Sequence, residues 1–421
     1  MEIKVCIIGA GPSGLMASIY SAAAGADTLV VETNTVAGRK LLLTGGGRCN
    51  FTHRAEPREL VRAFGLKGRF LSYCLHEFPP DKVRRFFQER GLESTVDETG
   101  CVFPITQRAS DVRDILVREA GKAGVRFLYD RRVEKVEKAA DAFTLLTNRG
   151  ETVRADKLII ATGGLSWPKT GSTGAGYRFA RELGHRVIEP RASLVPLVTS
   201  ERWPAELAGA AIENVKLSAS VKGRRVATSG PMVFAGNGIG GPAVLDLSRF
   251  LTDYLPNEKE PIAVSVDMIA GMDATIFERH LLSEVAANSN KAIANVLSAF
   301  VPKRVAEVLC EQAGCDANLL ANQVTKDIRK ELVRFLKAVP LSIVRTRPIE
   351  EATVTRGGVS TKEIDSKTME SKICPGLYFA GEILDVDGPC GGYNLQICWS
   401  TGALTGSQAG RAVITNTLTG C

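Results

Sequence analysis

Hydrophobic residues near the start of the chain form two continuous runs, with a glycine turn and a small-residue segment between them. Residues 3–8 read IKVCII, residues 9–14 read GAGPSG, residues 15–26 read LMASIYSAAAGA and residues 27–32 read DTLVVE. Continuous apolar runs are typical of parallel strands buried on both faces, and the Ala- and Leu-rich segment favours a helix. The pattern therefore predicts a strand, a glycine turn, a helix and a second parallel strand.

Amphipathic patterns continue up to about residue 190. Residues 81–91 begin with Asp and end with Gly, as an amphipathic helix should, and residues 110–124 repeat this pattern with Ser110 as the predicted N-cap. A hairpin is predicted through residues 148–150, and it returns in a buried strand at residues 158–161. The first part of the chain thus mixes helices with strands.

The periodicity changes near residue 190. Short alternating segments separated by turns predict a small barrel or sandwich, and residues 273–339 carry apolar side chains at helical spacing. The C-terminal part returns to an apolar strand, a glycine-rich loop and a small-residue helix, in the style of the N-terminus. We therefore predict three domains: a discontinuous first domain at 1–190 and 355–421, a β-barrel-like domain at 191–272 and 340–354, and a helical insert at 273–339.

Length, composition and charge limit the possible classes of protein. A chain of 421 residues is too long for one ordinary core. No apolar run is long enough to span a membrane and the N-terminus lacks the pattern of a signal peptide, so a cytoplasmic protein is expected. The net charge of +7 suits an anionic cofactor and does not by itself indicate nucleic acid. None of the ten cysteines forms a C-x-x-C motif, so no metal site is predicted.

The turn after the first strand has the spacing of a dinucleotide-binding motif. Gly9 would permit the tight turn, Gly11 would let a pyrophosphate approach the backbone, and Gly14 would let helix and strand pack closely. Ser13 lies in the same turn, and Glu32 ends the next strand, where its carboxylate can accept hydrogen bonds from ribose hydroxyls. The alternative is a plain strand–helix turn with Glu32 as a solvated strand end.

Two later segments favour FAD over a nicotinamide dinucleotide alone. The apolar strand KLIIATGG delivers Thr162 and Gly163 to a turn, and the strand in GLYFAGEILDVDG delivers Gly381 and Glu382 to a loop. A carboxylate at that loop can bind a ribityl hydroxyl, which FAD has and NAD lacks. Each segment alone is also compatible with a core strand that ends at a turn.

Four longer segments carry a resemblance to a known family. They are residues 38–52 (GRKLLLTGGGRCNFT), 170–185 (TGSTGAGYRFARELGH), 357–372 (GGVSTKEIDSKTMESK) and 376–402 (GLYFAGEILDVDGPCGGYNLQICWSTG). These segments resemble the BaiN/YhiN-like flavoproteins, which are NAD(P)/FAD-dependent oxidoreductases and include aminoacetone oxidase-like members. The resemblance implies an α/β fold, with a glutathione-reductase-like FAD-binding Rossmann domain interrupted by a β-barrel-like domain that carries a helical insertion.

The resemblance also implies particular cofactor contacts. Arg39 and Lys40 would approach the FAD phosphates or the adenosine side, and Val133 would bind adenine through its backbone. A helix starting near Gln396 would stabilise anionic reduced flavin with its positive end. Backbone N–H groups would reach the pyrimidine edge of the flavin from Gly391, Gly392, Tyr393, Asn394 and Leu395. The alternative for this last segment is a helix-capping loop.

The stretch LLLTGGGRCNFTH at residues 41–53 is interpreted as a wall of the cofactor pocket. Its leucines would pack while Gly47 and the two glycines before it keep the backbone thin beside FAD, and Arg48 and Asn50 are weak catalytic candidates. Elsewhere, Cys390 and Cys398 flank the predicted flavin loop; they are either redox-active or, more commonly for cysteines, buried inert thiols. The catalytic residues are left unassigned.

These observations predict an FAD-dependent oxidoreductase that acts on a small organic substrate. Hydride would pass through flavin N5, and an organic acceptor or oxygen would reoxidise the flavin. Because no second unit of strand, G-x-G-x-x-G turn and helix is predicted, NAD(P)H is considered only as a transient co-substrate. The alternatives are an FAD-dependent RNA-modifying protein, which scattered basic residues disfavour, and a flavin-binding sensor without turnover. Substrate and oligomeric state are left open.

Overall fold

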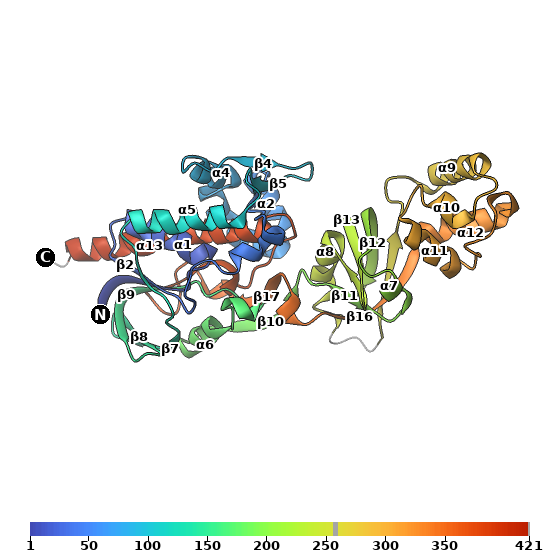
Figure 1. The fold of residues 1–421 in the computed structure, drawn as a ribbon. Coiled ribbons are helices and arrows are strands. Elements are labelled where there is room, and N and C mark those ends of the chain that lie inside the picture. The colour runs from blue at the N-terminus through green and yellow to red at the C-terminus, as the bar shows by residue number, and fades with distance from the viewer. Residues whose placement is uncertain (256–259, 420–421) are drawn as a thin grey trace. The chain divides into compact units, whose positions relative to one another are not determined.

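The chain forms two compact units in the computed structural model, which describes residues 1–255 and 260–419 (Figure 1). Unit 1 consists of Met1–Arg191 and Thr353–Cys421, and unit 2 consists of Ala192–Ala352. The helical segment 273–339 falls within unit 2, so its standing as a separate domain stays a prediction.

Unit 1 is built on a mostly parallel sheet with the strand order β6-β2-β1-β9-β8-β7. Strand β18 pairs with residues 158–160 of β9, beyond the residues of β9 that pair with β8. Strands β1, β2, β6, β9 and β18 are parallel, while β7 and β8 are antiparallel additions. The strands are β1 (Glu2–Ile8), β2 (Thr28–Val31), β6 (Arg126–Leu128), β7 (Val133–Ala139), β8 (Ala142–Thr147), β9 (Thr152–Ile160) and β18 (Leu377–Phe379). The predicted strand, turn, helix and parallel strand at the N-terminus are therefore present.

Two helices of unit 1 pack unusually closely (Figure 1). They are α1 (Pro12–Ala23) and α13 (Tyr393–Thr419). A Cβ atom on Gly402 would lie 2.5 Å from the carbonyl oxygen of Ser13, and one on Gly406 would lie 2.1 Å from that of Ala17. Because both members of these pairs advance by four residues, the two helices run in the same direction.

The register of these contacts determines how far apart the two helices begin, measured along the helix axis. Relative to the pair Gly402–Ser13, α1 begins one residue earlier at Pro12, while α13 begins nine residues earlier at Tyr393. At 1.5 Å per residue, the start of α13 therefore lies about 12 Å beyond the start of α1. The sheet and this helix pair thus set two helix N-termini at a defined spacing.

Smaller elements complete unit 1. The helices are α2 (Pro57–Ala63), α3 (Gly68–Glu77), α4 (Pro80–Gln88), α5 (Ala109–Lys122) and α6 (Ala175–Glu182). One small sheet joins β3 (Thr52–His53), β5 (Cys101–Pro104) and β4 (Ser94–Val96), and another joins β10 (Val187–Ser193) and β17 (Val354–Val359).

The predicted N-cap of α5 is wrong. The cap is Arg108, and Ser110 already lies inside the helix. The Arg108 guanidinium binds the Asp111 carboxylate at 3.1 Å, and the Ser110 hydroxyl contacts the same carboxylate instead of a backbone N–H. The N-cap therefore lies two residues before the serine that the sequence predicted for it.

Unit 2 contains a closed barrel with the strand order β11-β14-β13-β12-β15-β16. Its strands are β11 (Leu197–Thr199), β12 (Ala211–Val221), β13 (Arg224–Ala235), β14 (Gly238–Gly240), β15 (Ile262–Asp267) and β16 (Val339–Thr346). Its helices are α7 (Trp203–Glu206), α8 (Pro242–Leu251), α9 (Ala274–Ala287), α10 (Ile293–Leu297), α11 (Lys303–Gln312) and α12 (Lys326–Leu336). The predicted fold class, a Rossmann-type α/β sheet interrupted by a barrel with a helical insertion, is confirmed.

Candidate functional site

The glycine turn after β1 leaves open space at one position. A Cβ atom on Gly14 would lie 1.9 Å from the Gly9 carbonyl oxygen, whereas one on Gly11 would meet no atom within 4 Å. Gly11 is the N-cap of α1, and no side chain caps that helix. The N–H groups and positive dipole end of a helix start favour an anion. A pyrophosphate therefore fits beside Gly11.

Glu32 is buried at the end of β2, and both of its carboxylate oxygens accept hydrogen bonds. Its Oε2 atom accepts a hydrogen bond from the Ala10 N–H at 2.6 Å, and its Oε1 atom accepts from the backbone and side-chain nitrogens of Asn34 at 2.8 and 2.6 Å. Only 6% of Glu32 is exposed, so it is not a solvated strand end. Arg39 lies nearby, because its Nη1 atom donates to Asn34 Oδ1 at 2.9 Å.

The segment that leads into β7 runs beside Glu32. The Asp130 N–H donates to the Asn34 carbonyl, and the Arg131 N–H donates to the Glu32 carbonyl, both at 2.9 Å. Val133, the predicted adenine contact, follows two residues later and is buried at the start of β7. The segment expected to meet adenine therefore lies next to the residue expected to meet ribose.

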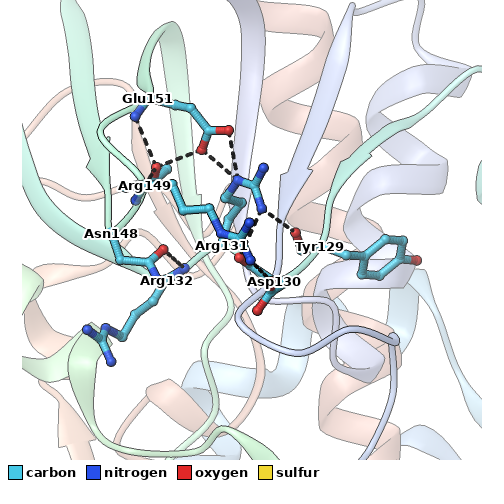
Figure 2. Close-up of polar contacts among 8 residues, drawn as sticks. Tyr129, Asp130, Arg131, Arg132, Asn148, Arg149 and Glu151 are labelled. Atoms are coloured by element: carbon cyan, nitrogen blue, oxygen red, sulfur yellow. Dashed lines mark hydrogen bonds and ion pairs between the residues drawn. The ribbon is translucent and has the colours of Figure 1, made fainter.

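Figure 2 shows how the turn between β8 and β9 holds this segment. Arg131 Nε donates to both carboxylate oxygens of Glu151, at 2.6 and 2.8 Å. The Arg132 N–H donates to Asn148 Oδ1 at 2.9 Å, and the Asn148 N–H donates back to the Arg132 carbonyl at 2.8 Å. These contacts fix the backbone just before Val133.

The ends of β9 and β18 meet the first turn of α1. A Cβ on Gly9 would lie 3.2 Å from Thr162 Cα, and a Cβ on Gly381 would lie 2.4 Å from Ser13 Oγ. Gly163 and Gly381 have φ values of +72° and +79°, which glycine adopts without strain. Thr162 Oγ1 is buried and has no hydrogen-bond partner in the described part of the chain. These predicted residues therefore converge around one helix N-terminus.

Glu382 belongs to a partly buried polar cluster. Lys40 Nζ donates to Glu382 Oε2 at 2.6 Å and to Ser166 Oγ at 2.7 Å. Glu382 Oε1 accepts from Ser166 Oγ at 3.0 Å and from the Thr355 N–H at 2.7 Å. The side chains of Lys40 and Glu382 are 22% and 15% exposed. Lys40 thus lies at the Glu382 end of the site, while Arg39 lies at the Glu32 end.

The loop before α13 is pressed against β3. Gly391 and Gly392 have φ values of +105° and +92°. A Cβ on Gly392 would lie 2.3 Å from the Thr52 carbonyl oxygen and 2.8 Å from Asn50 Oδ1. Both positions therefore require glycine, one of them because of direct steric contact.

Helix α13 begins at Tyr393, three residues before the predicted start near Gln396. The Gln396 N–H donates to the Gly392 carbonyl at 3.0 Å, which extends the helix backwards. Asn394 Oδ1 accepts from the Gly388 N–H at 2.8 Å, and its amide nitrogen donates to the Pro389 carbonyl at 3.1 Å. Tyr393, Asn394 and Leu395 therefore form the first helical turn instead of a loop.

The glycine-rich stretch after β2 only partly matches its predicted packing. Residues 45–47 are exposed, with φ between +57° and +89°. Leu43 is 46% exposed, so the expectation that all three leucines pack is wrong. Arg48 folds back, with its Nε atom 3.1 Å from the Gly45 carbonyl and its guanidinium 4.8 Å from the centre of the Phe103 ring. Asn50 Oδ1 accepts from the Val102 N–H at 3.2 Å.

The cysteines near the site are not joined in disulfides. Cys390 and Cys398 form no disulfide, and burial raises the pKa of Cys398 to about 12. Cys398 is therefore a protonated thiol at neutral pH.

Among the described residues, no group of three or more His, Cys, Asp or Glu side chains is arranged to hold a metal ion. In the same part of the chain, no helix is both long and apolar enough to cross a membrane.

Several residues at this site carry no local sequence signal. Ser166 and Thr355 complete the cluster at Glu382, but 189 positions separate them in the chain. His53 Nδ1 lies 3.0 Å from the Gly391 carbonyl oxygen, across 338 positions. Only Asn34 was accessible to sequence reasoning, because a polar residue two positions after Glu32 can bind back to it.

The chain matches a known protein family over nearly its whole length. A model of the HI0933-like protein Rossmann domain matches residues 3–408. The chain belongs to this family. It is 32% identical over 410 residues to 3-dehydro-bile acid delta(4,6)-reductase of Clostridium scindens, with 96% of this chain and 98% of that protein covered. It is 34% identical over 410 residues to ribosomal RNA dihydrouridine synthase of Escherichia coli K12, with 94% and 95% covered.

A solved structure supports the fold of this HI0933-like protein. The 3-ketosteroid-delta4-(5alpha)-dehydrogenase of Rhodococcus jostii RHA1, in complex with 4-androstene-3,17-dione, aligns with a TM-score of 0.50 and 17% identity, covering 98% of this chain and 96% of that one. At this identity the likeness concerns the fold alone. The predicted BaiN/YhiN-like family is confirmed, and with it the class of flavoprotein oxidoreductase.

Proposed function

We propose that this HI0933-like protein uses FAD to reduce a carbon–carbon double bond conjugated to a carbonyl group. One relative is named as a delta(4,6)-reductase of a 3-dehydro-bile acid, and another as a dihydrouridine synthase. Dihydrouridine is uridine with its C5–C6 double bond saturated beside the C4 carbonyl. The two named substrates differ in size, but both named activities involve saturating an activated double bond.

The observation that carries the cofactor assignment is the open space at Gly11 together with the spacing of the two helix starts. FAD has a pyrophosphate at its centre, with a ribityl chain between that group and the flavin ring. A separation of about 12 Å between the starts of α1 and α13 suits a pyrophosphate at the first and a flavin at the second. Glu32 would hold the adenosine ribose, and Glu382 would hold the ribityl chain.

When bound, FAD would supply hydride transfer through N5 of its flavin ring. The protein's part is then orientation and electrostatics. The positive end of α13 and the N–H groups of residues 391–395 would stabilise negative charge at the pyrimidine edge. The ion pair of Lys40 with Glu382 would keep the ribityl region electrically neutral.

Reducing equivalents would come from NAD(P)H as a transient co-substrate. The second G-x-G-x-x-G match, residues 236–241, connects β13 to the antiparallel strand β14 of the barrel, so it is not the strand–turn–helix unit of a second Rossmann domain. A small unsaturated ketone is the first candidate substrate. A uracil base in ribosomal RNA is the second candidate. It is favoured by the similarity to the Escherichia coli relative, which matches over 95% of its own length.

Anaerobic stopped-flow absorbance tests this proposal. The FAD-loaded protein is reduced with NADPH or NADH and mixed with a 4-en-3-one steroid or with uridine-containing RNA, and the saturated steroid serves as the control. Reoxidation by an unsaturated substrate, with formation of the saturated product, is expected. Reduced flavin that neither unsaturated substrate reoxidises, but that is reoxidised once oxygen is admitted, together with flavin reduction by an amine such as aminoacetone, would contradict the reductase assignment.

A further inference from the structure

His53 is the last residue of β3, and its side chain contacts the loop that precedes α13. Its Nδ1 atom is 3.0 Å from the Gly391 carbonyl oxygen. Its ring stacks on the Tyr393 ring, with centroids 4.7 Å apart and an interplanar angle of 25°. The imidazole therefore touches both the last loop peptide and the first residue of α13.

The opposite edge of the imidazole is closed by the turn before β5. A Cβ atom on Gly100 would lie 2.8 Å from His53 Nε2 and 3.0 Å from its Cε1 atom. Gly100 has a φ of +89°. His53 also pairs with Cys101 in the small sheet, so its backbone is fixed as well. The ring thus has one defined position, with Nδ1 toward Gly391.

This geometry determines the tautomer of His53. A carbonyl oxygen only accepts hydrogen bonds, so Nδ1 carries the proton in the contact with Gly391. Nε2 is then the atom that gains or loses a proton. The contact with Gly391 persists in both states, because Nδ1 keeps its hydrogen.

The contact with His53 controls a peptide unit expected to face the flavin. In a trans peptide the C=O of Gly391 and the N–H of Gly392 belong to one plane and point in opposite directions. Holding the carbonyl toward His53 therefore points the Gly392 N–H away from His53. A Gly-Gly peptide has little intrinsic preference between the two orientations, so an external anchor decides which one is populated.

We propose that His53 is a positioning residue, which orients the Gly391–Gly392 peptide so that the Gly392 N–H donates to the pyrimidine edge of the flavin. This inference rests on the FAD site proposed above. The donor stabilises the reduced flavin more than the oxidised flavin, because negative charge develops at that edge on reduction. His53 thereby raises the reduction potential without touching the reacting atoms.

The test compares flavin reduction potentials of the FAD-loaded full chain. His53→Phe keeps an aromatic ring against Tyr393 but has no donor, whereas His53→Gln keeps a side-chain N–H that can reach the Gly391 carbonyl. His76 provides a matched control, because its Nδ1 atom contacts the Ser72 carbonyl at 2.7 Å on the exposed face of α3. The control variant is His76→Gln.

We expect His53→Phe to lower the ratio of the affinities for reduced and oxidised FAD about tenfold, which corresponds to about 30 mV for a two-electron couple. His53→Gln should recover most of this loss, and His76→Gln should change nothing. His53→Ala, which lacks ring and donor, supplies the measurement if His53→Phe does not fold.

Unchanged potentials in His53→Phe or His53→Ala at full FAD occupancy would overturn the role of His53 alone. Equal losses in His53→Gln and His53→Phe would also overturn it, because the donor would then be irrelevant. A wild-type chain that takes up no FAD would overturn the proposed function as well, so the two failures are distinguishable.

Discussion

At the residue scale, Gly11 and Gly121 are both glycines at which an added Cβ would meet no atom within 4 Å, but only Gly11 lies at the predicted pyrophosphate position. Gly11→Leu should therefore fold and lose at least about 100-fold in FAD affinity, because the side chain occupies the space for the phosphates. Gly121→Leu, near the end of α5, should bind FAD normally. Titration of the apoprotein with FAD, followed by flavin fluorescence, measures both. Equal affinity in Gly11→Leu and wild type would contradict the motif assignment.

Lys40 provides a second residue-scale prediction. Lys40→Met leaves the mostly buried Glu382 carboxylate without its counter-charge, so the free energy of unfolding should fall by about 1–3 kcal/mol in urea denaturation. The additional change Glu382→Gln should recover part of that loss, because it removes the unpaired charge. Lys4→Met breaks the exposed ion pair with Asp156 and should cost less than about 1 kcal/mol. Equal costs at Lys4 and Lys40 would refute the proposed difference.

The pH dependence of stability provides a third test. Burial lowers the pKa of His53 below 6.5, although the Gly391 carbonyl, Asp97 and Glu59 oppose this shift and Arg54 adds to it. Between the folded pKa and 6.5 the unfolded chain binds the proton and the folded chain does not, so stability falls as the pH decreases through this range. His53→Gln should show a shallower fall in stability as the pH decreases below 6.5 in urea titrations. An unchanged slope would mean that His53 is not buried as described.

Residues with a local signal were predictable, and residues joined across the chain were not. Gly9, Gly14 and Glu32 follow from a motif of fixed spacing, and their packing and burial match what that spacing requires. The contact of Ser166 with Thr355 and that of His53 with Gly391 depend on tertiary folding. Leu43 shows the converse, because an apolar side chain in an apolar run still lies on the surface.

At the scale of elements, the close approach of α13 to α1 determines how far apart the two helix starts lie. A Cβ on Gly406 would lie 2.1 Å from the Ala17 carbonyl oxygen, so Gly406→Ala must push the helices apart. We expect a loss of about 1–3 kcal/mol in the free energy of unfolding, together with weaker FAD binding. Gly121→Ala in α5 should instead be neutral or stabilising by up to about 1 kcal/mol. Destabilisation by Gly406→Ala no greater than by Gly121→Ala would contradict this packing.

The types of elements were easier to predict than their ends. Apolar periodicity correctly placed β1, α1, β2 and β9 (residues 2–8, 12–23, 28–31 and 152–160). The starts of α5 and α13 were displaced: the N-cap of α5 is Arg108, and α13 begins at Tyr393, where the Gln396 N–H donates to the Gly392 carbonyl. Such boundaries depend on the local backbone conformation, which hydrophobic spacing does not encode.

At the scale of the whole molecule, the order of elements along the chain shows that the sheet of unit 1 is formed by two segments, with the barrel segment inserted between them in the sequence. The sheet of unit 1 is completed by β18, which arrives from the far end of the chain and pairs with β9. In the sequence, the barrel segment falls between β9 and β18. The barrel closes because β11 pairs with both β14 and β16. The sequence change near residue 190 indicated this interruption, while the choice between barrel and sandwich needed the strand pairing.

The central claim is that this chain is an FAD enzyme, and the cofactor content of the purified protein tests it most directly. The protein is purified, its visible spectrum is recorded, and the flavin released by denaturation is identified by chromatography and mass. The account predicts a yellow protein, or an apoprotein that takes up added FAD, with one FAD per chain and less than a tenth of that occupancy in Gly11→Leu. A colourless protein that takes up no FAD would contradict it.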